Sequence, residues 1–436
     1  MKDFGYGNYL TNLRLSCGFT QKELAKKLNI TNKAISKWEK GDAKPSLKQL
    51  PLLASIFGIS VEELITNQNK QKSKQITKIV VTGGPCGGKS TAMSWIQSEF
   101  TKKGYAVLFV PEVATELIMG GVAPWTMENT KIFQKQVLNL QLYKEAIFES
   151  AAHSIAGRDK VLIVCDRGAI DSKAYYDNEF EYYQNLKECG LHEISLRDSY
   201  DAVFHLVTAA KGAKEFYTLE NNNARTETVE QAIEKDNKTI TAWTGHPHFR
   251  IIDNSTDFKT KMHRLIAEIS QFLGEPEPYE IERKFLIKMP DLASLEKDQN
   301  VNKVEILQTY LKNQDCEEKR VRQRGLNGVY SYTLTTKKKI NDIKRIEKEK
   351  RITQEEYINL LMEADPNRKQ IKKDRYCLVY KNQYFEIDIY PDWKDKAIME
   401  IELCNENQDI FLPPNIEIIE EVTSNKEYSN FNLAKI

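Results

Sequence analysis

The segment ITKIVVTGGPCGGKST, residues 76–91, constrains the fold of this chain more than any other stretch. It places an apolar strand, a glycine-rich loop and the start of a helix in succession, and its loop fits the pattern G-x-x-x-x-G-K-[ST]. In such a loop backbone N–H groups surround a phosphate, the lysine neutralises the β- and γ-phosphates and the hydroxyl coordinates Mg²⁺. We therefore expect an α/β domain with a parallel sheet that binds ATP as substrate together with Mg²⁺ or Mn²⁺. The residues expected to bind ATP are Gly83, Gly84, Gly87, Gly88, Lys89, Ser90 and Thr91, and Ser90 is also expected to bind the metal.

Charged residues follow two further apolar strands. Glu112 comes after YAVLFVP, and Asp166 and Arg167 come after VLIVC. Because ligands of an open parallel sheet bind at the carboxyl ends of its strands, these side chains are expected near Lys89. Asp166 is the candidate magnesium carboxylate, and Glu112 is the candidate base that takes a proton from a substrate hydroxyl. Arg167 either holds a phosphate or forms a structural salt bridge.

Three later positions are further candidates. Arg225, in the polar stretch NNNARTETVEQ, is expected to be a lid arginine that closes on the transferring phosphoryl group, the alternative being a surface arginine. His246 and His248 lie two residues apart in GHPHF, and without further ligands we expect them to be structural and not to bind metal. Asp253 and Asn254 follow the strand FRII and are candidates for a nucleotide-base or capping role.

The chain has 436 residues, a length typical of two to four domains, and two stretches of it have the composition of domain boundaries. The polar stretch NQNKQKSKQ, residues 67–75, is typical of a linker, and two prolines interrupt residues 274–280. The sequence thus predicts an all-α domain over residues 1–66, a linker over 67–75, a P-loop domain over 76–273 and a strand-rich domain over 277–436.

Charge and composition narrow the possible partners. Residues 1–75 carry 13 Lys and Arg against 6 Asp and Glu, although the whole chain has a net charge of +1. Only this first part resembles a polyanion binder. For the whole chain, the mean hydropathy of −0.54, the lack of an apolar run near ~20 residues and seven cysteines without paired spacing predict a cytoplasmic protein with no membrane partner.

The first 66 residues predict about five short helices. Thr20 and Glu23 form a capping box, Thr31 is a plausible cap of the next helix, and Gly41 ends that helix. The stretch FTQKELAKKLNITNKAISKWEKG resembles the lambda-repressor-like (XRE-type) helix-turn-helix family over residues 8–65. The resemblance implies that the helix starting at Thr31 enters the major groove of duplex DNA, with a homodimer expected for operator binding; a protein-docking module is the alternative. The residues that would face DNA are Gln21, Thr31, Asn32, Lys33, Ser36 and Lys37.

Residues 76–272 resemble the kinase-like P-loop family AAA_28 and the nicotinamide riboside kinase part of bacterial NAD regulators, on the loop and strand ends described above. The resemblance implies ATP binding and phosphoryl transfer to a small molecule.

The last domain alternates charged and apolar residues along six predicted strands. Glu280, Glu282 and Lys284 share one face of the first strand, and acidic and basic clusters recur on the others. A closed barrel would collect these side chains in one ionic interior, where cations hold a polyphosphate and carboxylates hold a divalent metal.

E-I-E-R-K matches the E-x-E-x-K signature of the CYTH, or triphosphate tunnel, family, and the resemblance covers residues 279–436. It implies a metal-dependent triphosphate hydrolase, with an adenylate cyclase as the alternative. The phosphate-binding residues would be Lys284, Arg320, Arg322, Lys337, Lys373 and Arg375. The metal ligands would be Glu280, Glu282, Glu400 and Glu402, with Glu402 also the candidate base and Glu347, Glu349 and Asp388 in support.

Taken together, the sequence predicts a DNA-binding protein with a kinase-like ATP-binding domain and a triphosphatase domain. The competing hypothesis is a transcriptional regulator in which both later domains only sense nucleotides or polyphosphates.

Overall fold

The computed structural model describes residues 4–17, 19–59, 61, 64, 74–176, 178–212, 228–275, 281–312, 318–339, 345–403 and 408–436. These residues form two units, one of residues 1–75 with 157–160, the other of residues 76–156 and 161–436. No helix in the described part of the chain is both long enough and apolar enough to cross a membrane.

The first unit is helical, as predicted. Its described helices are α1 (Phe4–Ser16), α2 (Gln21–Lys27), α3 (Asn32–Glu39) and α4 (Leu50–Phe57). They enclose a core that includes Leu24, Ile35 and Leu53. The predicted capping box is present, since the Thr20 hydroxyl accepts from the Glu23 N–H at 3.2 Å and the Thr20 N–H donates to the Glu23 carboxylate at 2.7 Å. The expected fifth helix falls mostly outside the described residues.

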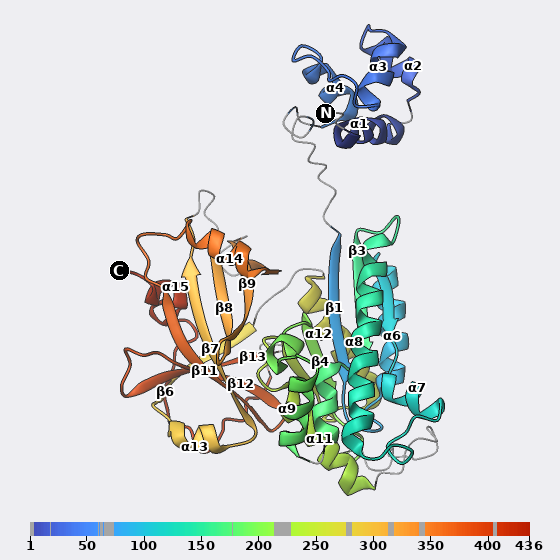
Figure 1. The fold of residues 1–436 in the computed structure, drawn as a ribbon. Coiled ribbons are helices and arrows are strands. Elements are labelled where there is room, and N and C mark those ends of the chain that lie inside the picture. The colour runs from blue at the N-terminus through green and yellow to red at the C-terminus, as the bar shows by residue number, and fades with distance from the viewer. Residues whose placement is uncertain are drawn as a thin grey trace. The chain divides into compact units, whose positions relative to one another are not determined.

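The second unit begins with a parallel sheet of strand order β2-β3-β1-β4-β5, covered by helices on both faces (Figure 1). Val80 of β1 packs into the core on one face, and Ile79 and Val81 pack into the core on the other. The elements in chain order are β1 (Gln75–Thr82), α6 (Lys89–Lys102), β2 (Ala106–Val110), α7 (Val113–Met119), α8 (Thr130–Ser154), β3 (Lys160–Asp166), η1 (Ala169–Tyr175), α9 (Glu179–Glu188), α10 (Glu193–Arg197), β4 (Ala202–Leu206), α11 (Val229–Trp243), β5 (Phe249–Ile252) and α12 (Phe258–Leu273). This is the predicted α/β domain with a parallel sheet.

An antiparallel sheet of order β10-β9-β8-β7-β11-β12-β13-β6-β14 completes the unit. Its elements are β6 (Ile281–Lys288), α13 (Leu292–Lys297), β7 (Val301–Tyr310), β8 (Glu318–Leu326), β9 (Val329–Lys339), β10 (Arg345–Ile352), α14 (Gln354–Leu361), β11 (Ile371–Tyr380), β12 (Gln383–Ile389), β13 (Lys396–Leu403), β14 (Ile418–Glu421), η3 (Lys426–Tyr428) and α15 (Asn430–Leu433). In the described residues β10 and β14 lie at two edges, so the pairing does not close the ring that a complete barrel would need.

The two sheets of this unit belong to one packed body. Arg324 of β8 donates to Asp198 at 3.3 Å and to the Gly245 carbonyl, and it is 5% exposed. The Tyr384 hydroxyl of β12 donates a hydrogen bond to the His246 carbonyl at 3.1 Å, and the Tyr384 ring meets Phe249 of β5 edge to face.

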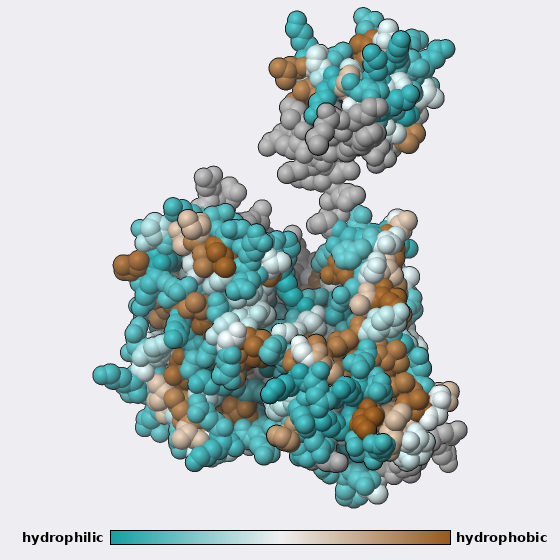
Figure 2. All heavy atoms as spheres, in the orientation of Figure 1, coloured by the Kyte–Doolittle hydropathy of each residue, from teal (hydrophilic) through white to brown (hydrophobic). Residues whose placement is uncertain are grey.

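Hydrophobic side chains are scattered among mainly hydrophilic ones on the face of the molecule that Figure 2 shows.

Candidate active sites

The glycine-rich loop lies between β1 and α6, as the sequence predicts. Gly83 has φ of +145°, and a Cβ there would come within 2.1 Å of the Leu206 carbonyl oxygen, so only glycine fits. Gly88 is the N-cap of α6 with φ of +96°. The first turn of α6, with Lys89, Ser90 and the backbone N–H groups around them, therefore opens at the carboxyl end of β1.

A buried carboxylate that sequence reasoning missed anchors this loop. Asp236 of α11 accepts hydrogen bonds from the Gly84 N–H at 2.9 Å and the Thr208 N–H at 3.1 Å. It also contacts His205 at 3.0 Å and Lys211 at 2.7 Å. Burial alone would raise the pKa of Asp236, but these partners outweigh it and hold the pKa well below its ordinary value. Nothing in the helix sequence VEQAIEKD marks this residue.

A buried lysine supports the loop from the other side. Lys261 of α12 donates to the Gly87 carbonyl at 3.2 Å, the Val207 carbonyl at 2.7 Å and the Asn254 amide oxygen at 2.7 Å. Asn254 in turn donates to the Thr208 and Lys211 carbonyls, both at 2.7 Å. Of the two roles predicted for Asn254, the capping role matches these contacts. Asp253 pairs with Arg264 at 2.8 Å.

Glu112, Asp166 and Lys89 meet beside the loop. Burial raises the pKa of Glu112, but Arg167 and Lys89 more than offset this and lower it to about 2. Burial together with the Glu112 charge raises the pKa of Asp166, against the effect of Lys89. The Oδ1 atom of Asp166 is buried without a hydrogen-bond partner in the described part of the chain. Such an oxygen fits a metal ligand, and with the Ser90 hydroxyl it supplies the hard donors that Mg²⁺ prefers.

Arg167 takes the structural role of the two that the sequence left open. It has positive φ, and its guanidinium pairs with Glu112 at 2.6 Å and with Asp171 at 3.2 Å. Asp171, five residues after Asp166 in the same segment, also accepts from the Gly168 N–H at 2.8 Å and the Trp243 indole at 3.1 Å. Arg225, the predicted lid arginine, lies outside the described residues.

A cavity of about 280 Å³ opens next to Lys89 and Glu112. Helices α7 and α8 and the segment η1 supply most of its wall, which combines apolar and polar side chains. Its lining includes Lys89, Glu112, Val113, Ile118, Trp125, Phe133, Gln134, Gln141, Arg167, Asp171 and Tyr175. The cavity therefore gives a small molecule access to the point where Lys89 would hold a γ-phosphate.

The backbone register places the predicted ionic residues of the antiparallel sheet on one face. Glu400 lies opposite Lys284, Glu402 opposite Glu282, and Glu386 opposite Glu400. Arg375 lies opposite Asp388 and Arg322 opposite Gln308. Residues directly opposite in antiparallel strands share a face. We call this side the ionic face, which carries Glu282, Lys284, Arg320, Arg322, Lys373, Arg375, Glu386, Asp388, Glu400 and Glu402.

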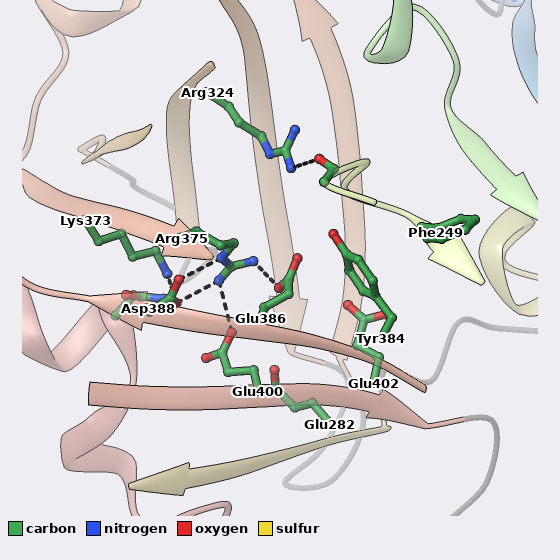
Figure 3. Close-up of polar contacts among 12 residues, drawn as sticks. Phe249, Glu282, Arg324, Lys373, Arg375, Tyr384, Glu386, Asp388, Glu400 and Glu402 are labelled. Atoms are coloured by element: carbon green, nitrogen blue, oxygen red, sulfur yellow. Dashed lines mark hydrogen bonds and ion pairs between the residues drawn. The ribbon is translucent and has the colours of Figure 1, made fainter. Parts of the chain in front are cut away.

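Cations and carboxylates of the ionic face pair with one another (Figure 3). Lys284 contacts Glu400 at 2.8 Å and Glu282 at 3.0 Å. Arg375 contacts Asp388 at 2.7 Å and Glu400 at 3.1 Å. Burial raises the pKa of Glu400, but Lys284, Lys373 and Arg375 hold it below its ordinary value. Burial lowers the pKa of Lys373 to about 8, against the charge of Asp388.

The carboxylate oxygens of this face fit Mg²⁺ or Mn²⁺ in chemistry. In the described residues, however, no three acidic, histidine or cysteine side chains converge as a ready metal cluster, because cations hold the carboxylates. Glu280 lies outside the described residues, as do the side chains of Lys337 and Glu347. Glu349 contacts Thr335 at 3.1 Å and lies 3.9 Å from Arg322.

Arg324 and His246 both lie at the contact between the two sheets. Arg324 follows Arg320 and Arg322 in the alternation but binds Asp198, so it serves packing. His246 is buried and accepts from the His248 N–H at 3.0 Å, and its other ring nitrogen lies 3.0 Å from the Tyr200 carbonyl. Burial lowers the pKa of His246 well below its ordinary value. These contacts agree with the structural role predicted for His246.

The predicted DNA-facing residues lie at α2 and α3. Asn32, Lys33 and Lys37 are exposed, and Ser36 is half-buried. The Thr31 hydroxyl caps α3 by accepting from the Ala34 N–H at 3.2 Å. The Gln21 amide donates to Glu39 at 2.7 Å, so it must release this bond to read a base.

Comparison with known proteins agrees with this organisation. Residues 10–64 match the helix-turn-helix family HTH_3, and residues 78–261 match the AAA domain family AAA_28. The chain therefore carries an XRE-type helix-turn-helix domain followed by an AAA_28 P-loop domain.

Two curated relatives share the first of these domains. The HTH-type transcriptional activator BcrR of Enterococcus faecalis is 32% identical over 63 residues, which are 14% of this chain and 31% of the relative. The SPbeta prophage-derived uncharacterized HTH-type transcriptional regulator YonR of Bacillus subtilis is 36% identical over 66 residues, which are 15% of this chain and 61% of the relative. The chain thus spans less than two thirds of either relative.

Solved structures similar to parts of the chain include the inorganic triphosphatase NE1496, with 29% identity, 36% of this chain and 93% of that chain covered, and a TM-score of 0.25. The restriction-modification controller protein C.AhdI of Aeromonas hydrophila has 28% identity, covers 14% of this chain and 92% of its own, and has a TM-score of 0.14.

Proposed function

We propose that this chain is a DNA-binding protein that couples an ATP-dependent phosphotransferase domain to a metal-dependent triphosphatase domain. The observation that carries the triphosphatase assignment is the ionic face, where the register gathers at least four cations and five carboxylates from neighbouring strands. A solvated sheet surface has no need to bury such groups, yet Lys373 and Asp388 are 1% and 0% exposed.

In the triphosphatase reaction Arg320, Arg322, Lys373 and Arg375 hold the phosphate chain, and Glu282, Glu400 and Glu402 hold Mg²⁺ or Mn²⁺ together with Glu280. When bound, the metal polarises the terminal phosphate and lowers the pKa of a water. Glu402, 32% exposed at its side chain, accepts the proton of that water. Lys284, paired with Glu400 in the free protein, would contact the substrate phosphate once Glu400 serves as a metal ligand.

In the phosphotransferase reaction the loop at residues 83–91 holds ATP, and Ser90 and Asp166 hold Mg²⁺, which neutralises the phosphate charge. The acceptor occupies the cavity next to Lys89. Glu112 orients the acceptor hydroxyl by accepting its hydrogen bond. Because its pKa is only about 2, it takes the proton late, once the phosphoryl group is leaving ATP. Arg225 closes over the phosphates.

When the chain binds duplex DNA, it acts as a homodimer and α3 lies in the major groove. The exposed Asn32 reads a base, and the exposed Lys33 and Lys37 contact phosphates. The hydrogen bond from Gln21 to Glu39 joins α2 to α3, and the Thr31 hydroxyl caps α3.

A phosphate-release screen of the full-length chain tests the triphosphatase assignment. The substrates are tripolyphosphate, nucleoside triphosphates and thiamine triphosphate, each with Mg²⁺ or Mn²⁺. Release of orthophosphate supports hydrolysis, whereas release of pyrophosphate with a cyclic nucleotide from ATP supports the cyclase alternative. Triphosphate binding without any product identifies the domain as a sensor.

A further inference from the structure

Strand β5, at one edge of the parallel sheet, carries a cation that reaches the ionic face. Arg250, the second residue of β5, pairs through its guanidinium with the carboxylate of Glu402 on β13. Phe249, the preceding residue, packs against Tyr384 with ring centroids 5.8 Å apart (Figure 3). Arg250 therefore reaches the ionic face from a strand that packing against β12 holds in place.

Arg250 also contacts the helix that supports the glycine-rich loop. The Nε atom of Arg250 lies 3.5 Å from Glu268, a residue of α12 that is 5% exposed. Helix α12 also carries Lys261, which donates to the Gly87 carbonyl of the glycine-rich loop. One arginine thus connects a carboxylate of the ionic face to the helix that supports the phosphate loop.

A second contact between the two sheets lies beside it. His248, two residues before Arg250, lies 3.9 Å from Glu349 of β10. Burial raises the pKa of Glu349, but His248 and Arg322 outweigh it and keep this carboxylate ionised. The loop before β5 and β5 itself therefore approach carboxylates on β10 and β13, on the face where the triphosphate is expected.

Arg250 resembles Lys284 in what it does. Lys284 neutralises Glu400, and Arg250 neutralises Glu402, while both carboxylates belong to the proposed metal set. The difference is that Lys284 comes from the antiparallel sheet and Arg250 comes from the ATP-binding domain. A divalent metal and a guanidinium on the same carboxylate repel each other, so the pairing of Arg250 with Glu402 weakens metal binding there.

We propose that Arg250 is a positioning residue of the triphosphatase site that the ATP-binding domain supplies: it holds Glu402 in the free protein, and a divalent metal must displace it. This inference rests on the proposed triphosphatase function. The ATP-binding domain thereby opposes metal loading of the ionic face.

The test is the dissociation constant of Mn²⁺ for the full-length protein, measured by electron paramagnetic resonance without nucleotide. Arg250→Gln is expected to bind Mn²⁺ roughly 10–100-fold more tightly, because it removes a cation that repels a metal ion bound to the same carboxylate. Glu268→Gln is expected to weaken Mn²⁺ binding. Of the two carboxylates that Arg250 contacts, Glu402 is then the one left, so Arg250 holds it more firmly. Arg283→Gln, which removes a surface pair with Glu421 on the other face of β6, is the matched control and is expected to leave Mn²⁺ affinity unchanged.

Thermal unfolding of each variant shows that the fold is kept, and Arg250→Lys restores the wild-type Mn²⁺ affinity if the charge is what matters. Equal or weaker Mn²⁺ binding by folded Arg250→Gln overturns the inference while the metal site itself stands. If no Mn²⁺ binds in the wild type or in Arg250→Gln, or if Glu400→Gln leaves both the number of bound Mn²⁺ ions and their affinity unchanged, the proposed metal site fails and the inference fails with it.

Discussion

Lys89 is the residue on which we expect the proposed ATP binding to depend most. It is 8% exposed at the first position of α6, next to Glu112 and Asp166. We expect Lys89→Ala to weaken ATP binding by roughly 10–100-fold, since a hydrogen bond to a charged group contributes about 1.5–3 kcal/mol. Titration calorimetry measures the change. Lys102→Ala, at the exposed end of the same helix, is the control, and equal ATP affinity of both variants would contradict the assignment.

Asp198 gives the packing of the two sheets a defined pH dependence. Burial raises its pKa, but Arg197, Arg324, His246 and Ser331 lower it from 3.8 to about 2. A carboxyl group with a lowered folded-state pKa stabilises the fold fully above its unfolded value, and this contribution disappears as the pH falls through the folded value. We expect the wild type to lose about 2 kcal/mol of stability through this group between pH 5 and 2.

Urea unfolding at a series of pH values measures that loss. In Asp198→Asn the loss should be absent, and removing one partner of a buried ion pair should cost about 3–5 kcal/mol at pH 7. Asp392→Asn, 83% exposed at its side chain, should follow the wild type. If the stability of Asp198→Asn changes with pH in the same way as that of the wild type, the pKa of Asp198 is not lowered by its partners and this prediction is wrong.

At the scale of elements, α3 carries the prediction for DNA. Asn32→Ala is expected to relax the preferred sequence at a cost of roughly 1–3 kcal/mol, because it removes a base contact. Lys33→Ala should instead weaken binding to all sequences and reduce the salt slope by about 1. Selection from a random duplex library followed by fluorescence anisotropy measures both, with Lys369→Ala as the control. The same enriched sequence and salt slope in all three variants would place the DNA contact elsewhere.

The elements show what a single sequence predicts and what it leaves open. Local patterns sufficed for the cap at Thr20, the helix that Thr31 caps and the loop at Lys89, because each depends on neighbours within a few residues. Period-two alternation sufficed to place Glu400 and Arg375 on one face of a sheet.

Contacts between distant segments could not be predicted in this way. Asp236 binds Gly84 across 152 residues, and Arg324 binds Asp198 across 126. Nothing local distinguishes Arg324 from Arg322, since both continue the same alternation. The role of Arg167 could not be predicted for the same reason. Whether it binds phosphate or forms a salt bridge depends on Glu112, which is 55 residues away in the sequence. The order of the strands in the antiparallel sheet could not be predicted locally either, because it depends on pairing between strands far apart in the sequence.

At the scale of the whole molecule, the parallel and antiparallel sheets form one unit, joined by Arg324, Tyr384 and Arg250. A fragment that starts near residue 277 lacks Asp198, the partner of Arg324 in a buried ion pair. Such a fragment would lose the contacts that hold Arg324 in place. Assays of the triphosphatase site therefore belong in the full-length chain. Hydrolysis is separated from ATP turnover by using tripolyphosphate as the substrate and Lys89→Ala as the background.

The most direct test of the central claim is orthophosphate release from tripolyphosphate by full-length Lys89→Ala protein with Mg²⁺ or Mn²⁺, compared with the same protein carrying Glu400→Gln or Glu402→Gln. We expect release in the background, and a fall of ~10²–10⁴-fold with Glu402→Gln if that carboxylate takes the proton of the water. Glu400→Gln should lower release through loss of the metal, and Arg283→Gln should leave it unchanged. No release with either metal from folded protein, or release that survives both glutamate substitutions, would contradict the assignment of the ionic face as a triphosphatase site.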